Sequence, residues 1–136
     1  MKEKKVNILV VDDEKDVELL FQQKLRKEIR NGSIELKFAF SGNEALEIME
    51  KSESKEVMYI FSDINMPGMT GLELLDKLKA KFPQIPVSMI SAYGDAENYE
   101  KAIELGAKEF FVKPINFENL KVELNKIIEE KEPKQE

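Results

Sequence analysis

The chain has 136 residues, of which 42% are hydrophobic and 35% are charged, and its formal net charge is −6. This length suits one globular domain, and the balance of apolar and charged residues is that of a water-soluble protein. The absence of cysteine and histidine excludes disulfides, zinc–thiolate sites and the usual histidine-dependent catalytic pairs. The acidic charge disfavours direct nucleic-acid binding, and no apolar run is long enough to cross a bilayer.

Apolar segments alternate with helical patterns along the first half of the chain. Val6–Val11 is nearly continuous in apolar residues and predicts a buried strand. Apolar residues at helical spacing from Val17 to Ile29 predict a helix, which Asn31-Gly32 should end. Alternation from Leu36 to Phe40 predicts a second strand with one less buried face, and a capping-box pattern then opens the next helix.

The same alternation continues in the second half. A third strand is predicted at Met58–Ser62 and a fourth at Val87–Ile90, with a capping-box helix between them. A helix from about Asp95 to Leu105 should stop at Gly106. A short fifth strand at Glu109–Val112 then precedes a final amphipathic helix.

Five βα units predict an α/β fold in which a parallel sheet is covered by helices on both faces. The alternation alone does not give the order of the strands in the sheet. We expect residues 1–130 to form one domain and residues 131–136, which are almost all charged or polar, to form a solvated tail.

Polar residues of complementary chemistry follow four of the predicted strands. Asp12 and Asp13 follow the first strand and Asp63 the third, while Ser91 ends the fourth and Lys113 follows the fifth. In open α/β sheets, ligands bind outside the carboxyl ends of the strands. If these strands are neighbours, three carboxylates, a hydroxyl and an ammonium converge at one edge of the sheet.

Each of these residues also has an ordinary explanation when it is taken alone. Asp12 or Asp13 would serve as a helix N-cap, Asp63 and Ser91 as turn residues, and Lys113 as a solvated charge. Taken together they indicate a different kind of site, because three neighbouring carboxylates repel one another unless a cation lies among them. Magnesium suits such a site, since it takes oxygen ligands and keeps several waters that phosphate can replace.

This constellation resembles the receiver domain of two-component response regulators, and the likeness covers roughly Lys5 to Glu129. Four segments in the expected order carry it. They are Ile8-Leu9-Val10-Val11-Asp12-Asp13-Glu14, Ser62-Asp63-Ile64-Asn65-Met66-Pro67-Gly68-Met69-Thr70-Gly71, Ile90-Ser91-Ala92, and Gly106-Ala107-Lys108-Glu109-Phe110-Phe111-Val112-Lys113-Pro114. Each segment is weakly specific alone, whereas four in this order and spacing are strongly specific.

The resemblance implies a flavodoxin-like three-layer (βα)5 sandwich with strand order 2-1-3-4-5, and a cis bond between Lys113 and Pro114. It implies that Asp63 accepts a phosphoryl group from the phosphohistidine of a sensor kinase. Asp12, Asp13, Asp63 and the backbone carbonyl of Asn65 would bind Mg²⁺, and Lys113 would contact the phosphoryl group.

Two further residues are implied to form the switch. Ser91 would hydrogen-bond the phosphoryl group, and Phe110 would turn inward as Ser91 moves. Ser91 stands where threonine is commoner, and Phe110 where many members have tyrosine, so this switch would lack a phenolic hydrogen bond. Asn65 and Tyr93 occupy positions that border the phosphoryl group, and we expect them to tune the access of water to it.

The resemblance implies a cytoplasmic, single-domain signalling switch similar to chemotaxis regulators. Its partners would be a sensor histidine kinase or histidine phosphotransfer protein and a downstream target protein, with a phosphorylation-dependent homodimer as a further option. Two alternatives remain open: a fragment of a longer regulator, and a phosphohydrolase of the haloacid-dehalogenase type. The latter carries Asp-x-Asp at the nucleophile, whereas this chain has Asp63-Ile64-Asn65. We therefore expect slow autodephosphorylation rather than turnover of external phosphoesters.

Overall fold

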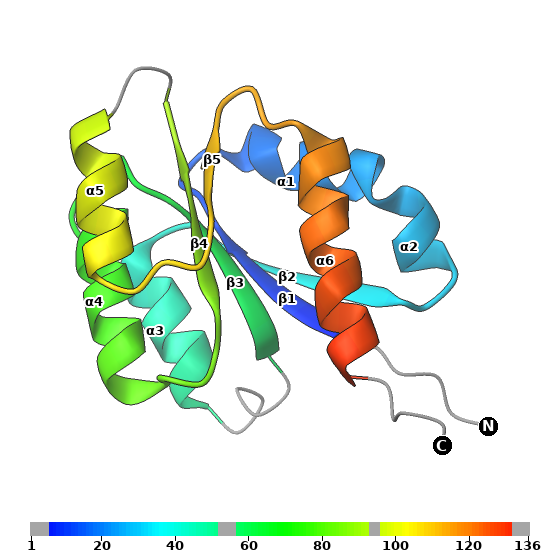
Figure 1. Ribbon diagram of the computed structural model, residues 1–136, viewed down its shortest axis with the longest axis horizontal. Helices are drawn as coiled ribbons and strands as arrows, with labels where there is room; N and C mark the ends of the chain where they lie inside the picture. The colour runs from blue at the N-terminus through cyan, green and yellow to red at the C-terminus, as the bar shows by residue number, and fades with distance from the viewer. Residues whose placement is uncertain (1–5, 52–56, 93–95, 132–136) are drawn as a thin grey trace.

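The computed structural model describes residues 6–51, 57–92 and 96–131 of the chain. Strands and helices alternate, except that two helices follow the first strand (Figure 1). The elements are β1 (Val6–Val11), α1 (Lys15–Lys24), α2 (Arg26–Arg30), β2 (Ile34–Ala39), α3 (Gly42–Glu50), β3 (Val57–Asp63), α4 (Gly71–Lys81), β4 (Val87–Ser91), α5 (Ala96–Glu104), β5 (Phe110–Val112) and α6 (Phe117–Lys131).

The five strands form one parallel sheet in the order β2-β1-β3-β4-β5. This order confirms the arrangement that the family resemblance implied and places β1 and β3 side by side near the middle of the sheet. Val11 pairs with Ser62, the residue before Asp63, so the ends of β1 and β3 lie level with each other. Ser91 pairs with Val112 in the same way, which brings the residue after β5 to this edge.

Helices cover both faces of the sheet, as the alternation predicted. Figure 1 shows α3, α4 and α5 on one face and α1, α2 and α6 on the other. Alternate residues of β1 point to the two layers, since a strand has a side-chain period of two. Leu9 and Val11 pack under α3 and α4, whereas Ile8 and Val10 pack with residues of α1 and α6.

The predicted first helix differs from the observed one, because the segment divides into α1 and α2 at Leu25. Leu25 is fully buried and has φ −106° and ψ 20°, outside the helical range. Leu25 belongs to the same buried cluster as Phe21 and Leu124, and beyond it α2 packs near β2. The helix still ends before Gly32, whose φ of +84° favours glycine.

The remaining boundaries differ slightly from the predicted ones, and both capping patterns are confirmed. β3 is one residue longer at each end, from Val57 to Asp63, and β5 begins at Phe110. Ser41 accepts a hydrogen bond from the Glu44 amide, while Thr70 and Glu73 form a complete capping box at α4. No helix among the described residues is both long and apolar enough to cross a membrane.

Candidate functional site

The carboxyl ends of β1, β3 and β5 bring two buried carboxylates and one lysine together. Lys113 Nζ lies 3.3 Å from Asp63 Oδ1 and 3.5 Å from Asp12 Oδ2. The other oxygen of Asp12 accepts a hydrogen bond of 2.9 Å from the backbone N–H of Glu14. Asp12 and Asp63 are buried, whereas Lys113 is about one third exposed. The ammonium therefore bridges two carboxylates at the rim of the site.

A third carboxylate completes an acidic cluster. One oxygen each from Asp12, Asp13 and Asp63 can be chosen so that all three lie within 4.8 Å of one another, and Asp13 is the most exposed of these residues. Three carboxylates and one ammonium leave an excess of negative charge. Hard oxygen donors at this spacing match the preference of Mg²⁺, so the residues present fit the ion that the sequence predicted.

The electrostatics of the cluster are set by burial. Burial and the neighbouring Asp12 carboxylate raise the pKa of Asp63 to about 6, although Lys113 opposes this shift. Burial also raises the pKa of Asp12, against the Glu14 hydrogen bond and the attraction of Lys113. Burial alone would lower the pKa of Lys113, but Asp63 and Asp12 outweigh it and raise this pKa. The single ammonium of Lys113 therefore does not offset the effect of burial on Asp12 and Asp63, and the pKa values of both carboxyl groups stay raised.

The residues expected to form the switch lie beside this cluster, on β4 and β5. Ser91 is fully buried, and its carbonyl accepts a hydrogen bond of 2.8 Å from the Lys113 amide. Phe110 is half-buried on the α5 face of the sheet and makes an edge-on ring contact with Tyr99 at 5.3 Å. The Lys113–Pro114 bond is cis, as the resemblance implied.

The loop after β3 is held against the start of α4. The Gly71 amide donates a hydrogen bond of 2.8 Å to the Ile64 carbonyl. A Cβ at Gly71 would lie only 2.0 Å from the carbonyl oxygen of Asp63, so no larger residue fits without moving the backbone. Asn65 lies exposed in this loop, consistent with a position at the rim. Tyr93, the other predicted rim residue, lies outside the described residues.

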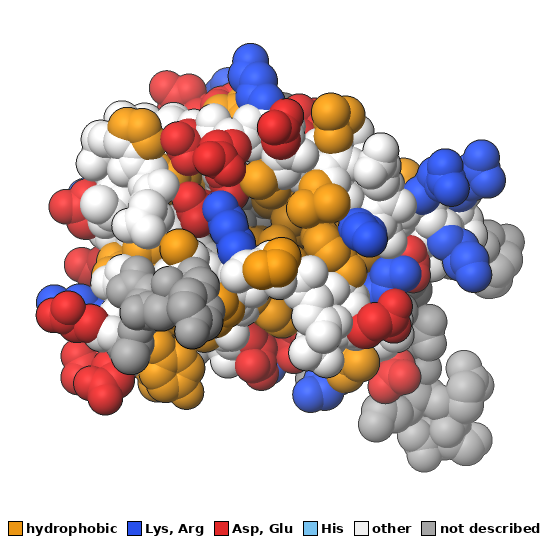
Figure 2. All heavy atoms as spheres, turned by 90° about the horizontal axis from the view of Figure 1, so that it is seen from above, with side chains coloured by type: hydrophobic (Ala, Val, Ile, Leu, Met, Phe, Trp, Pro, Cys, Tyr) orange, Lys and Arg blue, Asp and Glu red, His pale blue; other side chains and the backbone are white. Residues whose placement is uncertain are grey.

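An apolar pocket adjoins the lysine of the acidic cluster. It has a volume of about 400 Å³, and its lining runs from α1 to the segment after β5. The lining residues are Glu14, Val17, Leu20, Lys24, Lys113, Pro114, Ile115 and Phe117. Figure 2 shows this end of the molecule, with acidic side chains gathered next to a basic one and a hydrophobic hollow beside them.

A second buried polar cluster lies deeper on β3, and the sequence reasoning missed it. The Tyr59 hydroxyl is hydrogen-bonded to Ser88 Oγ on β4 at 2.5 Å and donates to Glu123 Oε2 on α6 at 3.2 Å. Lys108 Nζ lies 3.4 Å from the same carboxylate oxygen. Burial raises the pKa of Tyr59, so the hydroxyl keeps its proton. The available signal was Glu123 itself, which falls on the apolar face of the last helix, between Leu120 and Leu124.

Solved structures of receiver domains share this architecture. The receiver domain protein from Clostridium thermocellum superposes with a TM-score of 0.81 at 27% identity, covering 93% of this chain and 96% of that one. The receiver domain of NtrX from Brucella abortus gives 0.77 at 35% identity, covering 90% and 98%. A CheY-like receiver domain protein from Methanospirillum hungatei gives 0.80 at 27% identity, covering 93% and 96%.

Curated relatives are longer proteins. The transcriptional regulatory protein ZraR of Escherichia coli K12 is 32% identical over 123 residues, which are 90% of this chain and 26% of that protein. A cyclic di-GMP phosphodiesterase of Thermotoga maritima is 38% identical over 86 residues, which are 63% of this chain and 22% of that protein. The chain thus spans about a quarter of the length of these relatives. Residues 8–125 match the sequence profile described as the response regulator receiver domain. Together with the fold, this match makes the chain a member of the response regulator receiver domain family.

Proposed function

We propose that the chain is a phosphorylation-dependent signalling switch whose phosphoacceptor is Asp63. The observation that carries this proposal is the placement of Asp63 beside Asp12, Asp13 and Lys113 at the end of the central strand. The phosphoryl donor would be the phosphohistidine of a sensor histidine kinase or of a histidine phosphotransfer protein. Family membership supports this class of donor, because two-component signalling is the general role of receiver domains.

In the transfer step, a carboxylate oxygen of Asp63 attacks the phosphorus of the phosphohistidine. The new O–P bond forms as the P–N bond breaks, and the imidazole of the partner leaves with the electron pair. Lys113, now held by Asp63 and Asp12, is within reach of a phosphoryl oxygen on Asp63 and would offset its added charge. A bound magnesium ion would neutralise further phosphoryl charge, held by Asp12, Asp13, Asp63 and the backbone carbonyl of Asn65.

The signal would then pass through Ser91 and Phe110 to the surface of α5, β5 and α6. The Ser91 hydroxyl would donate a hydrogen bond to a phosphoryl oxygen, and Phe110 would change its packing against Tyr99. Exposed apolar side chains on this surface are available for a partner. They are Tyr99, Ile103, Val112 and Val122, each between 43% and 56% exposed. A bias of about 1–3 kcal/mol between two arrangements would change the affinity for a partner about 5–150-fold.

The partners would use different parts of the molecule. The apolar pocket beside Lys113 borders the acidic cluster, which supports docking of the phosphohistidine-bearing protein there. The α5–β5–α6 surface would contact a downstream target protein or, after phosphorylation, a second copy of the chain. Because the donor kinases act in the cytoplasm, we propose that compartment for the switch.

A phosphohydrolase acting on external substrates is the weaker candidate. The residue two positions after Asp63 is Asn65, whose amide cannot serve as the acid and base that such an enzyme needs. Asn65 would instead orient a water molecule toward the phosphoryl group, which would give slow autodephosphorylation. We propose that Tyr93 acts with Asn65 in setting this rate.

Incubation with acetyl phosphate and magnesium tests the proposal directly. Intact-mass spectrometry should show the gain of one phosphoryl group, and Asp63→Asn should abolish it. Asp76→Asn, which changes an exposed aspartate of α4, is the matched control and should be labelled like the parent. Equal labelling of Asp63→Asn and the parent would assign the phosphoacceptor to another residue.

A further inference from the structure

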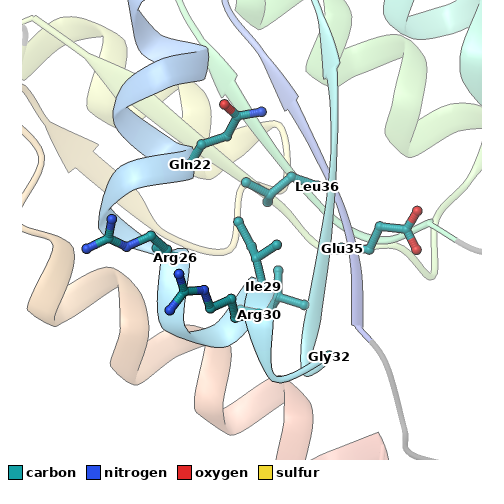
Figure 3. Close-up of a pocket in the computed structure, with 8 residues that line it drawn as sticks. Gln22, Arg26, Ile29, Arg30, Gly32, Glu35 and Leu36 are labelled. Carbon is teal, nitrogen blue, oxygen red and sulfur yellow. The ribbon is translucent and has the colours of Figure 1, made fainter.

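A groove between α2 and β2 lies apart from the residues used above. Its volume is about 430 Å³, and its floor is formed by the apolar side chains of Ile29, Ile34 and Leu36. Ile29 and Leu36 point toward each other across the groove in Figure 3, whereas Glu35 points away from it. The lower end is closed by the turn at Gly32, where Asn31 Oδ1 accepts hydrogen bonds from the amide and hydroxyl of Ser33.

Both arginines of the chain line this groove. The sequence contains only Arg26 and Arg30, one helical turn apart on α2, and all other basic residues are lysines. Both side chains are exposed, and neither makes an ion pair with a carboxylate among the described residues. Figure 2 shows Lys and Arg side chains gathered at this side of the molecule. Arginine presents a planar fork of donors that matches a carboxylate in a way that lysine does not.

The strand that borders the groove is an edge strand. β2 stands at one end of the sheet and pairs with β1 on its inner side. An edge strand offers backbone N–H and C=O groups to an added strand, and alternate side chains of that strand then point to the same face. A single extended segment can thus use the backbone of β2 and the apolar floor together, with Arg26 and Arg30 on the α2 side of the groove.

We propose that the α2–β2 groove binds an extended, acidic peptide segment of a partner protein. One bulky apolar side chain of the peptide occupies the floor over Ile29 and Leu36, and flanking carboxylates pair with Arg26 and Arg30. Charge complementarity selects this occupant, because Arg26 and Arg30, which make no ion pair within the described part of the chain, offer local positive charge on a protein whose net charge is −6.

This docking site is independent of the phosphorylation site. The groove lies at the beginning of β2, whereas Asp12 and Asp63 lie at the carboxyl ends of their strands, at the opposite end of a parallel sheet. Binding at the groove is therefore the same for the phosphorylated and unphosphorylated chain. Such a site recruits a partner constitutively, while the α5–β5–α6 surface responds to the signal.

Fluorescence anisotropy with a labelled synthetic peptide tests the proposal. The peptide carries a central leucine with two glutamates on each side, and two control peptides replace the leucine by glycine or the glutamates by lysines. The double variant Arg26→Gln/Arg30→Gln should weaken binding of the leucine peptide by about tenfold or more. The control Lys77→Gln/Lys101→Gln removes the same charge from exposed positions on α4 and α5 and should change binding less than about twofold.

Several outcomes would overturn the inference. Equal weakening by the two double variants would show non-specific attraction, and equal binding of the leucine and glycine peptides would show that the floor is empty. Competition by inorganic phosphate or an oligonucleotide at lower concentration than the peptide would make the groove a phosphate or nucleic-acid site. Asp63→Asn and beryllofluoride should leave the affinity unchanged, and a large change would place the peptide on the switch surface instead.

Discussion

The two buried polar clusters on β3 differ in whether their charges are balanced. At the carboxyl end of the strand, Lys113 pairs with two of three clustered carboxylates, and burial raises the pKa of Asp63 and Asp12. Farther back, the single carboxylate of Glu123 is matched by the Tyr59 hydroxyl and by Lys108. Burial and mutual repulsion make the charges of the first cluster unfavourable for folding, whereas the second cluster joins β3, β4 and α6. This contrast supports the first cluster as the proposed binding site and gives the second a structural role.

Removing one charge from the incomplete cluster should have the largest effect on stability. In excess EDTA at pH 7.5, Asp63→Asn should raise the free energy of unfolding by an amount on the order of 2 kcal/mol, since a buried, repelled carboxylate is neutralised. Urea unfolding measures this change, with Asp76→Asn as the exposed control. A variant less stable than the parent would mean that pairing with Lys113 outweighs the repulsion.

The opposite sign is expected in the complete cluster. Tyr59→Phe keeps the ring but removes the hydroxyl, so Ser88 and Glu123 each lose a buried hydrogen-bond partner. We expect the free energy of unfolding to fall by about 1.5 kcal/mol. Tyr99→Phe is the matched control, because Tyr99 is about half exposed. Equal effects of the two substitutions on the free energy of unfolding would show that the hydrogen-bond network does not stabilise the fold.

The raised pKa of Asp63 also makes the stability of the fold depend on pH. The pKa of Asp63 is raised to about 6 in the fold, so between pH 4 and 6 the native state binds more protons than the unfolded chain. Stability without metal should therefore increase by about 1.4 kcal/mol as the pH falls from 7.5 to 5. Thermal unfolding in EDTA at several pH values measures it. Asp63→Asn should flatten this part of the profile, and an unaltered slope would assign the effect to other groups.

Magnesium should complete the incomplete cluster and leave the other unchanged. At five times its dissociation constant, the ion should stabilise the parent by about 1 kcal/mol. Asp13→Asn should weaken magnesium binding, measured by titration calorimetry, while Tyr59→Phe should bind magnesium like the parent. An affinity unaffected by Asp13→Asn would exclude this carboxylate from the metal site.

Much of the fold could be predicted from the sequence, because strand and helix periodicities differ and two capping boxes mark helix starts. The order of the strands came from the family resemblance, since alternation does not determine which strands are neighbours. The break at Leu25 was not predicted, because a buried leucine fits the periodicity of a continuous helix equally well. Only the tertiary packing of Leu25 decides that the backbone turns there.

The acidic cluster was predictable for a simple geometric reason: residues that follow parallel strands meet at one edge. The network of Tyr59, Ser88 and Glu123 was not, because its members come from three elements whose rotation about their axes is fixed by packing. Periodicity gave a signal only at Glu123, a charged residue on an apolar helix face. The α2–β2 groove was similarly hidden, although the two arginines four residues apart were visible in the sequence.

Gly71 contributes no functional group, yet it determines how close α4 can approach the end of β3. A Cβ at Gly71 would overlap the Asp63 carbonyl oxygen, so the helix docks directly on the backbone of the proposed phosphoacceptor. A designer who transferred the three carboxylates and the lysine to another parallel sheet would therefore reproduce the functional groups without their relative positions. The transplant would also need a glycine at the start of the following helix, which a search restricted to reactive side chains would overlook.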